Sequence, residues 1–538
     1  MITIALAQSN FIVGDIAGNV AKIINLHIKA SEQNADLIVF SEMAITGYPP
    51  EDLVLRKRFQ EAAMQAVSQL AKITSTGAAM LVGGLWCEDN RLFNTAFLLD
   101  GGNIIHRQYK HNLPNYGVFD EKRVFQEGDI AEPVLWRGVK LGVLICEDMW
   151  ASSVADSLKK NDAELLVVIN ASPYEMAKAK KRMETASARV SETGLPLVYV
   201  NQIGGQDELV FDGRSFVMSA DAQIKLRLQH FAEDFEMVKW QKESGTWDCE
   251  AGRVEQSLGD EETIYRAMAL GLRDYVEKNK FPGVVLGLSG GVDSALTAAV
   301  AVDALGGARV QAIMMPSLYT SKDSLEDAEK VARMLGIRLD TIAISGGMNA
   351  FDNMLAPVFA GAIPDTTEEN IQSRLRGNIL MSVSNKKGSL VLTTGNKSEM
   401  SVGYATLYGD MCGGYSVLKD VYKTTVYKLS KWRNQQSPVM PERVITKAPS
   451  AELKPNQTDQ DSLPPYDVLD AVLLRLIEQQ LSVAEIAGQG YNKETVERVA
   501  KMLYRAEYKR RQAPPGVKIT GMSFGRDRRY PITNGWVG

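Results

Sequence analysis

Residues 284–302 read VVLGLSGGVDSALTAAVAV, and this stretch decides the fold of the second half of the chain. The run VVLGL is apolar throughout, which is typical of a strand buried on both faces of a sheet. A turn of small residues follows it, and a helix pattern begins at about residue 293. This order predicts a strand, a glycine turn and a helix in direct succession.

The turn Ser289-Gly290-Gly291-Val292-Asp293-Ser294 has the chemistry of a phosphate site. Small residues let the backbone approach a ligand, and consecutive N–H groups at a helix N-terminus bind anions. Ser289 and Ser294 add hydroxyl groups, and Asp293 is suited to hold Mg²⁺ on the phosphates. The spacing differs from that of the Walker loop and of the dinucleotide-binding turn. The alternative is a plain strand–helix turn in which Asp293 only caps the helix.

These six residues resemble the signature S-G-G-x-D-S of the pyrophosphate-loop ATPases and match it at every fixed position. The resemblance implies an enzyme that cleaves ATP between its α and β phosphates and adenylates a substrate carboxylate for attack by an amine. The ATP-binding residues that it implies are Gly287, Leu288, Ser289, Gly290, Gly291, Val292, Asp293 and Ser294.

The sequence around this turn alternates strand and helix patterns. Further strands are predicted at residues 310–315, 341–344 and 389–394, and helices at residues 263–279, 323–335 and 368–386. Regular alternation of this kind indicates an α/β fold with a doubly wound parallel sheet. We place this Rossmann-like domain at residues 263–538.

Five downstream segments resemble the NAD synthetase branch of these ATPases: residues 315–328, 368–380, 394–411, 449–470 and 507–533. The resemblance implies that Thr394 and Lys423 contact ATP and that Asn370, Glu399 and Lys509 bind deamido-NAD. It also implies a magnesium site at Asp293, Glu399 and Ser450, where Ser450 replaces the threonine of ammonia-only synthetases.

Each of these residues also has a simpler interpretation. Glu399 and Asn370 could be solvated helix residues. The cations Lys509, Arg510, Arg511, Arg526, Arg528 and Arg529 could form a solvated basic face or a nucleic-acid arm. Two substrates that carry pyrophosphate groups offer a better use for so many cations.

The first part of the chain has a different order of strand and helix patterns. Apolar runs at residues 2–7, 35–40, 78–86, 95–100, 139–145, 164–170 and 195–201 predict strands, and residues 17–33 and 57–75 predict helices. Two strands follow each other directly across residues 92–108, so the pattern is α-β-β-α. We place this domain at residues 1–240, and a linker at the polar, aperiodic residues 241–262.

Cys146 stands where the apolar run 139–145 ends, directly before Glu147. A thiol is only ~3% ionised at neutral pH, so a nucleophilic cysteine needs a base and a cation nearby. The alternative is an inert core cysteine. Glu42 follows the strand at 35–40 and Lys110 follows the strand pair. Glutamate as base, lysine as oxyanion partner and cysteine as nucleophile make a complete set for amide hydrolysis.

The order Glu42, Lys110, Cys146, each after a strand, resembles the nitrilase superfamily, and the string CEDMW resembles its glutaminase branch. The resemblance implies an α-β-β-α sandwich and glutamine binding by Tyr116, Ser172 and Lys178. Ser172 could otherwise be a helix entry before Pro173, and Lys178 a solvated charge. The family often has proline before the glutamate, whereas this chain has Ser41.

Length and composition limit the remaining classes. A chain of 538 residues is too long for one core, so two large domains are expected. The net charge of −5 argues against a general nucleic-acid binder, and no apolar run approaches the ~18 residues of a membrane span. The N-terminus reads as a strand rather than a signal peptide. Four scattered cysteines suggest a reducing compartment, the cytoplasm, with Cys87, Cys249 and Cys412 as structural residues.

Together the resemblances imply that glutamine hydrolysis supplies ammonia, that ATP with Mg²⁺ adenylates deamido-NAD, and that amidation yields NAD, AMP and pyrophosphate. Ammonium is not nucleophilic, so the ammonia needs shielding from water. One alternative is an amidotransferase that acts on another carboxylate. Another is an ammonia-fed synthetase with an inactive nitrilase-like scaffold. The resemblance also implies a homo-oligomer, a dimer or larger.

Overall fold

The computed structural model describes residues 1–243 and 245–536. Residue 244, inside the predicted linker, and residues 537–538, at the end of the second predicted domain, lie outside the described residues. The chain divides into two compact units, Met1–Ser257 and a second unit that begins at Leu258. Each unit is described by itself.

The described residues of the first unit form two large sheets and a small hairpin. The seven-stranded sheet has the order β15 (Thr246–Cys249), β14 (Asp234–Glu243), β1 (Ile2–Gln8), β2 (Leu37–Val39), β3 (Ala79–Glu88), β4 (Arg91–Asp100) and β5 (Asn103–Tyr109). The six-stranded sheet has the order β13 (Ile224–Arg227), β12 (Phe216–Met218), β9 (Leu197–Asn201), β8 (Leu165–Asn170), β7 (Val139–Ile145) and β6 (Val134–Trp136). The hairpin is β10 (Ile203–Gln206) with β11 (Leu209–Asp212).

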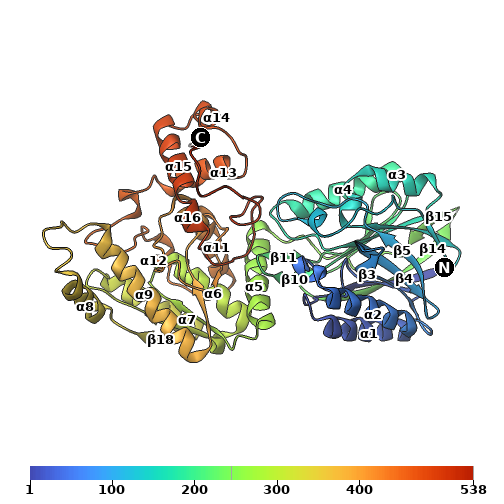
Figure 1. Cartoon of the computed structure of the whole chain (residues 1–538), viewed down its shortest axis with the longest axis horizontal. Coiled ribbons are helices and arrows are strands. Elements are labelled where there is room, and N and C mark those ends of the chain that lie inside the picture. Colours follow the sequence, from blue (N-terminus) through green and yellow to red (C-terminus); the bar gives the residue numbers. More distant parts are fainter. Residues whose placement is uncertain (244, 537–538) are drawn as a thin grey trace. The chain divides into compact units, whose positions relative to one another are not determined.

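These sheets pack face to face between two pairs of helices (Figure 1), as predicted from the α-β-β-α rhythm. Helices α1 (Ile16–Glu32) and α2 (Lys57–Ile73) cover the outer face of the larger sheet. Helices α3 (Ser152–Lys160) and α4 (Lys178–Thr193) cover the other sheet. The shared core between the sheets includes Leu6 and Val167. Because the central strands are buried on both faces, their sequences are continuously apolar.

The structure differs from the predicted linker at residues 241–262. Strand β14 pairs with β1 along Ile2–Gln8 and continues to Glu243, and β15 pairs with β14. The segment looked aperiodic because β15 is the edge strand of the sheet and residues 241–243 of β14 extend past β1 to pair with it, so polar side chains can reach solvent there. The two compact units meet at Ser257 and Leu258 instead.

The described part of the second unit is built on a five-stranded sheet in which all neighbouring strands are parallel. Its order is β18 (Arg338–Thr341), β17 (Val310–Met314), β16 (Val284–Gly287), β19 (Leu390–Thr393) and β20 (Tyr415–Ser416). The first strand of this unit, β16, lies at the centre of the sheet, and later strands add on both sides of it. The doubly wound sheet predicted from the sequence is therefore confirmed. Ligands bind such sheets at the carboxyl ends of the strands, where the winding direction reverses.

Helices accompany this sheet and extend beyond it (Figure 1). They are α5 (Asp260–Lys278), α6 (Val292–Leu305), α7 (Lys322–Leu335), α8 (Ser345–Leu355), α9 (Thr366–Lys387), α10 (Lys397–Val402), α11 (Lys423–Gln436), α12 (Glu442–Thr446), α13 (Tyr466–Ile477), α14 (Val483–Gly488), α15 (Lys493–Arg505) and α16 (Glu507–Arg510). Helices α13, α14 and α15 share a separate apolar cluster with residues of α10.

One predicted strand is misplaced. The prediction at residues 341–344 falls on the end of β18 and the residues after it, whereas β18 itself spans Arg338–Thr341. It is an edge strand that pairs only with β17 among the described strands. Arg338 and Asp340 form an ion pair of 2.8 Å on it. The apolar pattern does not reveal β18, because an edge strand needs less apolar surface than a central one and can carry charged residues.

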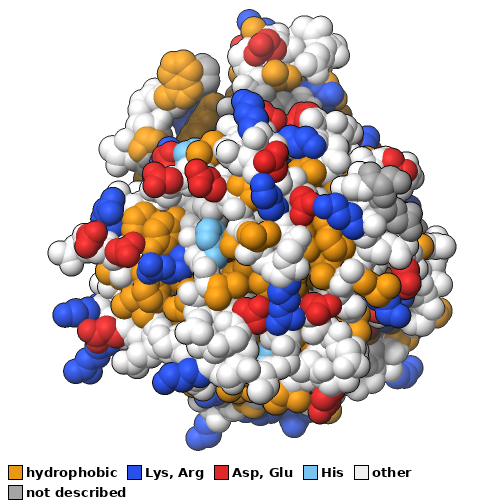
Figure 2. All heavy atoms as spheres, turned by 90° about the vertical axis from the view of Figure 1, so that its right-hand side faces the viewer, with side chains coloured by type: hydrophobic (Ala, Val, Ile, Leu, Met, Phe, Trp, Pro, Cys, Tyr) orange, Lys and Arg blue, Asp and Glu red, His pale blue; other side chains and the backbone are white. Residues whose placement is uncertain are grey.

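Acidic and basic side chains are interspersed on the face shown in Figure 2, in keeping with a net charge of only −5. None of the helices in the described part of the chain combines the length and the apolarity that crossing a lipid bilayer would require.

Candidate active sites

Cys146 lies in a tight turn at the end of β7. It is the first residue of a 3₁₀ turn, Cys146–Met149, and its φ of 47° is in the left-handed region. The Asp148 carboxylate holds this turn, because it accepts the N–H of Ile145 at 3.1 Å and that of Asn112 at 2.7 Å. A residue other than glycine keeps such a conformation only where its surroundings enforce it, as at many active sites.

The ammonium of Lys110 is the centre of a buried hydrogen-bond network in the first unit. It donates to Glu42 Oε1 at 2.8 Å and to Glu121 Oε1 at 2.9 Å. The side chains of Lys110 and Glu42 are 1% and 0% exposed. Asn94 Nδ2 also donates to Glu42 Oε1, and the N–H of Ala171 donates to its Oε2 at 3.0 Å. The structure thus brings Glu42 and Lys110 together and fixes the carboxylate at both oxygens.

The electrostatics of this network favour the protonated thiol. Burial raises the pKa of Cys146 well above its ordinary value, the charge of Glu42 raises it further, and Lys110 opposes both. Burial by itself lowers the pKa of Lys110, but the carboxylates of Glu121 and Glu42 outweigh burial, so its pKa is raised. A thiol in this state needs a base to accept its proton before it can attack.

Tyr116 and Lys178 flank one aromatic ring. The Tyr116 and Phe119 rings meet edge to face at 5.6 Å, and Lys178 Nζ lies 5.3 Å from the Phe119 ring centroid. The Tyr116 hydroxyl donates to Glu147 Oε1 at 2.9 Å. Glu147 is the residue directly after Cys146 in the chain. Ser172 is buried, and its N–H donates to Asn201 Oδ1 at 2.9 Å. A half-exposed tyrosine and a lysine beside the thiol turn can hold a polar ligand.

In the second unit, the predicted glycine turn joins β16 to the N-terminus of α6. The Ser289 and Ser294 hydroxyl groups lie 3.1 Å apart, and the N–H of Gly291 donates to Ser289 Oγ at 3.2 Å. Gly290 has a φ of +82°, and a Cβ built on it would lie 2.3 Å from the carbonyl oxygen of Ser324. This position therefore requires glycine. The turn ends at a helix N-terminus, which binds anions.

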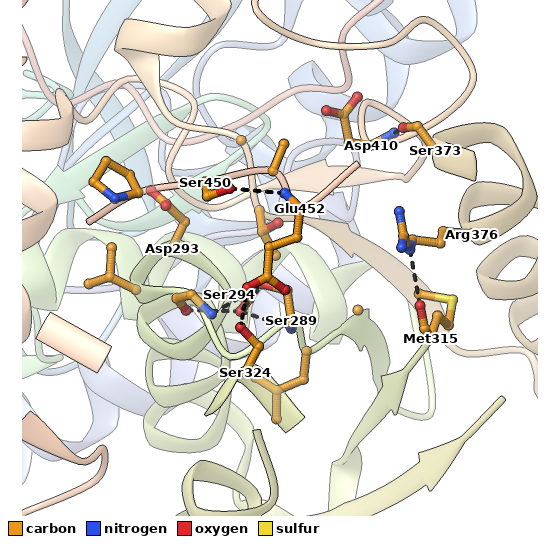
Figure 3. Close-up of a pocket in the computed structure, with 18 of the residues that line it drawn as sticks. Ser289, Asp293, Ser294, Met315, Ser324, Ser373, Arg376, Asp410, Ser450 and Glu452 are labelled. Atoms are coloured by element: carbon orange, nitrogen blue, oxygen red, sulfur yellow. Dashed lines mark hydrogen bonds between the residues drawn. The ribbon is translucent and has the colours of Figure 1, made fainter. Parts of the chain in front are cut away.

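The turn opens into a pocket of about 300 Å³ (Figure 3). The predicted residues that line it are Gly287, Leu288, Ser289, Gly291, Val292, Asp293, Ser294, Thr394, Glu399, Lys423 and Ser450. In Figure 3 the Ser289 and Ser294 side chains lie below the carboxylate of Glu452, and Arg376 lies on another wall. Sequence positions more than 150 residues apart along the chain therefore share one site, as expected at the carboxyl ends of parallel strands.

Lys423 joins the two carboxylates of this pocket. Its ammonium pairs with Asp293 and lies 3.5 Å from Glu399 Oε1. Asn396, the N-cap of α10, donates to Asp293 Oδ1 at 2.9 Å. Burial raises the pKa of Glu399 to about 8, Lys423 opposes this shift, and Asp293 adds to it. The two carboxylates thus repel each other across one shared cation.

Comparison with known proteins covers both units. The carbon-nitrogen hydrolase family model matches residues 3–246, and the NAD synthase family model matches residues 264–513. The chain is 48% identical over 542 residues to a glutamine-dependent NAD(+) synthetase of Rhodobacter capsulatus, with 99% of this chain and 98% of the relative covered. The chain belongs to the glutamine-dependent NAD(+) synthetase family. The family predicted from the sequence motifs is confirmed.

Other members of the glutamine-dependent NAD(+) synthetase family agree. The Thermotoga maritima relative is 42% identical, with 99% of this chain and 98% of the relative covered. A solved structure of the Acinetobacter baumannii glutamine-dependent NAD+ synthetase in complex with ADP has a TM-score of 0.81 at 45% identity, and the match covers 99% of each chain.

Two residues predicted to bind deamido-NAD do not line the pocket. Lys509 Nζ donates to the carbonyl groups of Gly403 and Ala405 at 2.8 and 2.7 Å. Asn370 Oδ1 accepts the Thr406 hydroxyl at 2.8 Å. Both side chains therefore hold the loop that follows α10. Gly290 also does not line the pocket, because its role is to let the backbone pass Ser324.

The structure corrects part of the prediction that the basic C-terminal segment binds substrate phosphates. Arg510 and Arg528 are buried rather than available to substrate phosphates. Both donate to Glu507 Oε2, at 2.8 and 2.6 Å, and Arg510 also donates to the carbonyl of Ser401 at 2.6 Å. The sequence cannot show that these arginines are buried, because the same residue types occur both in buried ion pairs and on solvated surfaces.

Several polar residues in these sites were not predicted. In the first unit, Glu121 shares Lys110 with Glu42 and accepts the Tyr48 hydroxyl at 2.9 Å. In the pocket, the unpredicted residues include Arg376, Asp410 and Glu452. All three stand in segments that resemble the family, which is the only signal that could have indicated them.

Proposed function

We propose that this chain hydrolyses glutamine to glutamate and ammonia at Cys146, and uses the ammonia to amidate deamido-NAD at the glycine-turn pocket. ATP is cleaved to AMP and pyrophosphate in the second reaction. The observation that carries this proposal is the buried set of Lys110, Glu42 and the strained Cys146 turn, on the same chain as the S-G-G-V-D-S pocket.

At the first site, Glu42 accepts the proton of the Cys146 thiol, and the thiolate sulfur attacks the amide carbon of glutamine. The Lys110 ammonium stabilises the negative oxygen of the tetrahedral intermediate, because it is a buried cation that is already oriented. The C–N bond breaks, and the leaving nitrogen takes the proton from Glu42 and departs as ammonia. Water, deprotonated by Glu42, then cleaves the thioester and releases glutamate.

At the second site, the glycine turn holds the ATP phosphates with its N–H groups and with the hydroxyls of Ser289 and Ser294. The carboxylate of deamido-NAD attacks the α-phosphorus, and pyrophosphate leaves. Ammonia then attacks the acyl carbon of the adenylate, AMP leaves, and the amide of NAD remains. Thr394 and Lys423 line the phosphate end of this pocket, and Lys423 supplies positive charge there.

The oxygen-rich end of the pocket fits Mg²⁺, which takes one or two carboxylates and completes its shell with phosphates and water. Asp293, Glu399 and the Ser450 hydroxyl would hold it there, and a cation would relieve the repulsion between the two carboxylates. Among residues 1–243 and 245–536, no group of three or more His, Cys, Asp and Glu side chains could hold a metal ion alone. When bound, Mg²⁺ would neutralise charge on the phosphates.

The assignment of substrate residues rests on family resemblance. Tyr116, Ser172 and Lys178 bind glutamine, and Asn370, Glu399 and Lys509 serve deamido-NAD, with Lys509 and Asn370 acting through the loop at 403–406. The family resemblance also implies that the chain associates as a homo-oligomer, a dimer or larger. Its place in the cytoplasm rests instead on the four scattered cysteines, which suggest a reducing compartment.

The experiment that tests the proposal supplies the purified chain with glutamine, ATP, Mg²⁺ and deamido-NAD. NAD, AMP and pyrophosphate should form in equal amounts, and a panel of other carboxylic acids should not replace deamido-NAD. Formation of ADP and phosphate, or preference for another acid, would contradict it. Absence of glutamate formation, with synthesis from ammonia intact, would show that the first unit is an inactive scaffold.

A further inference from the structure

A buried ion pair lies behind the loop that follows β8. Arg182 on α4 and Asp212 at the end of β11 form it, with side chains that are only 2% and 3% exposed. Arg182 Nη2 donates to Asp212 Oδ1 at 3.0 Å, and Nη1 donates to Oδ2 at 3.3 Å. Burial by itself lowers the pKa of Arg182, yet the Asp212 carboxylate outweighs burial and the pKa is raised. The pair is therefore a fork-to-fork contact between two charged groups.

The same guanidinium holds Ser172. Arg182 Nη2 donates to the Ser172 carbonyl at 3.2 Å and to its hydroxyl oxygen at 3.3 Å. On the other side, Asn201 accepts the Ser172 N–H and donates to the Ser172 carbonyl at 3.3 Å. Both backbone groups and the hydroxyl of Ser172 are thus fixed by buried side chains.

The neighbouring residue extends this support to the general base. The N–H of Ala171 donates to Glu42 Oε2 at 3.0 Å, while Lys110 binds the other oxygen. Ala171 and Ser172 are consecutive, so a shift of Ser172 also moves the donor that orients Glu42. The ion pair, loop residues 171–172 and the base therefore form one continuous chain of contacts.

Stability alone does not explain a buried ion pair at this place. Taking two charges out of water costs about as much as their attraction returns, and a well-packed apolar pair is often as stable. A planar guanidinium with several donors, by contrast, orients a carboxylate and a backbone carbonyl together, which lysine cannot do. The geometry favours a role in orientation.

We propose that Arg182, held by Asp212, is a positioning residue for glutamine hydrolysis that fixes residues 171–172, so that Ser172 meets glutamine and Glu42 meets the thiol. This inference rests on the proposed glutaminase activity. It adds an ion pair that does not itself touch the reacting atoms.

The test uses the full chain and two nitrogen sources. Arg182→Lys keeps the charge but cannot bind Asp212 and Ser172 in the same plane, so kcat/KM for glutamine should fall about 10²-fold, as for a misplacement of about 1 Å. Synthesis from concentrated ammonia should stay at the wild-type rate, because it needs only the second unit. Arg189→Lys is the matched control, since Arg189 is also a largely buried arginine on α4 but pairs with Glu192 of the same helix.

A double variant separates positioning from stability. Arg182→Met with Asp212→Leu removes both charges together, so its melting temperature should lie near that of the wild type while glutamine use stays low. Recovery of glutamine kcat/KM in this variant would overturn the proposal, and so would wild-type kcat/KM in Arg182→Lys. An equal loss of ammonia-driven synthesis in Arg182→Lys would also overturn it. Failure of the proposed function is distinct, because the wild-type chain would then form no NAD from glutamine.

Discussion

Lys110 balances the charges of the thiol site at the scale of single residues. One ammonium faces two carboxylates, Glu42 and Glu121, and all three side chains are buried. Burial raises the pKa of Glu121 to about 7, and Glu42 adds to this shift while Lys110 opposes it. Glu121 therefore keeps its proton until the pH approaches 7.

The raised pKa of Glu121 leads us to expect that the stability of the fold depends on pH. The folded chain keeps its proton up to about pH 7, whereas an unfolded glutamate releases it near its ordinary pKa of 4.5. Because the folded state then binds more protons, the free energy of unfolding falls as pH rises through this window. Glu121→Gln removes the titration and keeps an acceptor for Lys110 and Tyr48. Calorimetry between pH 5 and 8 should show the wild type losing melting temperature relative to the variant. A constant difference would contradict this assignment.

Cys146 is the residue on which glutamine use depends. Cys146→Ala should abolish NAD synthesis from glutamine, with a loss of at least about 10³-fold, because no nucleophile remains. Synthesis from ammonia at mildly alkaline pH should persist, because more of the ammonia is then unprotonated. Cys249→Ala is the matched control, since Cys249 belongs to the same buried cluster as Cys146 but stands on β15, where Asp248 and Lys225 are the charged groups that act on its thiol. A folded Cys146 variant that is inactive with ammonia would show that the thiol serves synthesis itself.

At the scale of elements, the turn between β16 and α6 forms the proposed phosphate site. The carboxyl end of a parallel strand meets a helix N-terminus there, and a helix N-terminus favours anions. The turn can pass Ser324 only because Gly290 has no side chain. Sequence and local geometry agree closely at this element.

Gly290→Ala should therefore disable synthesis. The added Cβ would collide with the Ser324 carbonyl, and the φ of +82° would strain alanine by about 1–2 kcal/mol. We expect kcat/KM for ATP to fall at least about 10²-fold with either nitrogen source, while glutamine hydrolysis continues. Gly306→Ala is the control, because Gly306, at the other end of α6, has a φ of +81° and an open position for Cβ. Equal effects of the two changes would mean that strain alone is responsible.

At the scale of the whole molecule, two units with separate cores divide the chemistry. Asp293→Ala should give the reverse of the Cys146 variant, because it removes the carboxylate that pairs with Lys423 and that would hold Mg²⁺. NAD should form from neither nitrogen source, and some glutamine hydrolysis should remain when glutamate is measured. Undiminished synthesis in this variant would remove Asp293 from the proposed ATP site.

The sequence alone determined the two fold classes and the family, and it predicted the residues around which each proposed site is built. Continuous apolar runs revealed the buried strands, because strands covered on both faces need apolar residues at every position. The S-G-G-V-D-S turn and the residues Glu42, Lys110 and Cys146 could be predicted because their chemistry requires particular residue types at the ends of strands.

Only the tertiary structure decided which polar residues share a site and which are structural. It joined Glu121 to Lys110, placed Arg510 and Arg528 in a buried cluster with Glu507, and set Arg182 behind Ser172. It also extended the first sheet to Cys249, across the range predicted to be a linker. These features depend on burial and on partners distant in the chain. The identity of a charged residue does not indicate whether it is buried or which residue it pairs with.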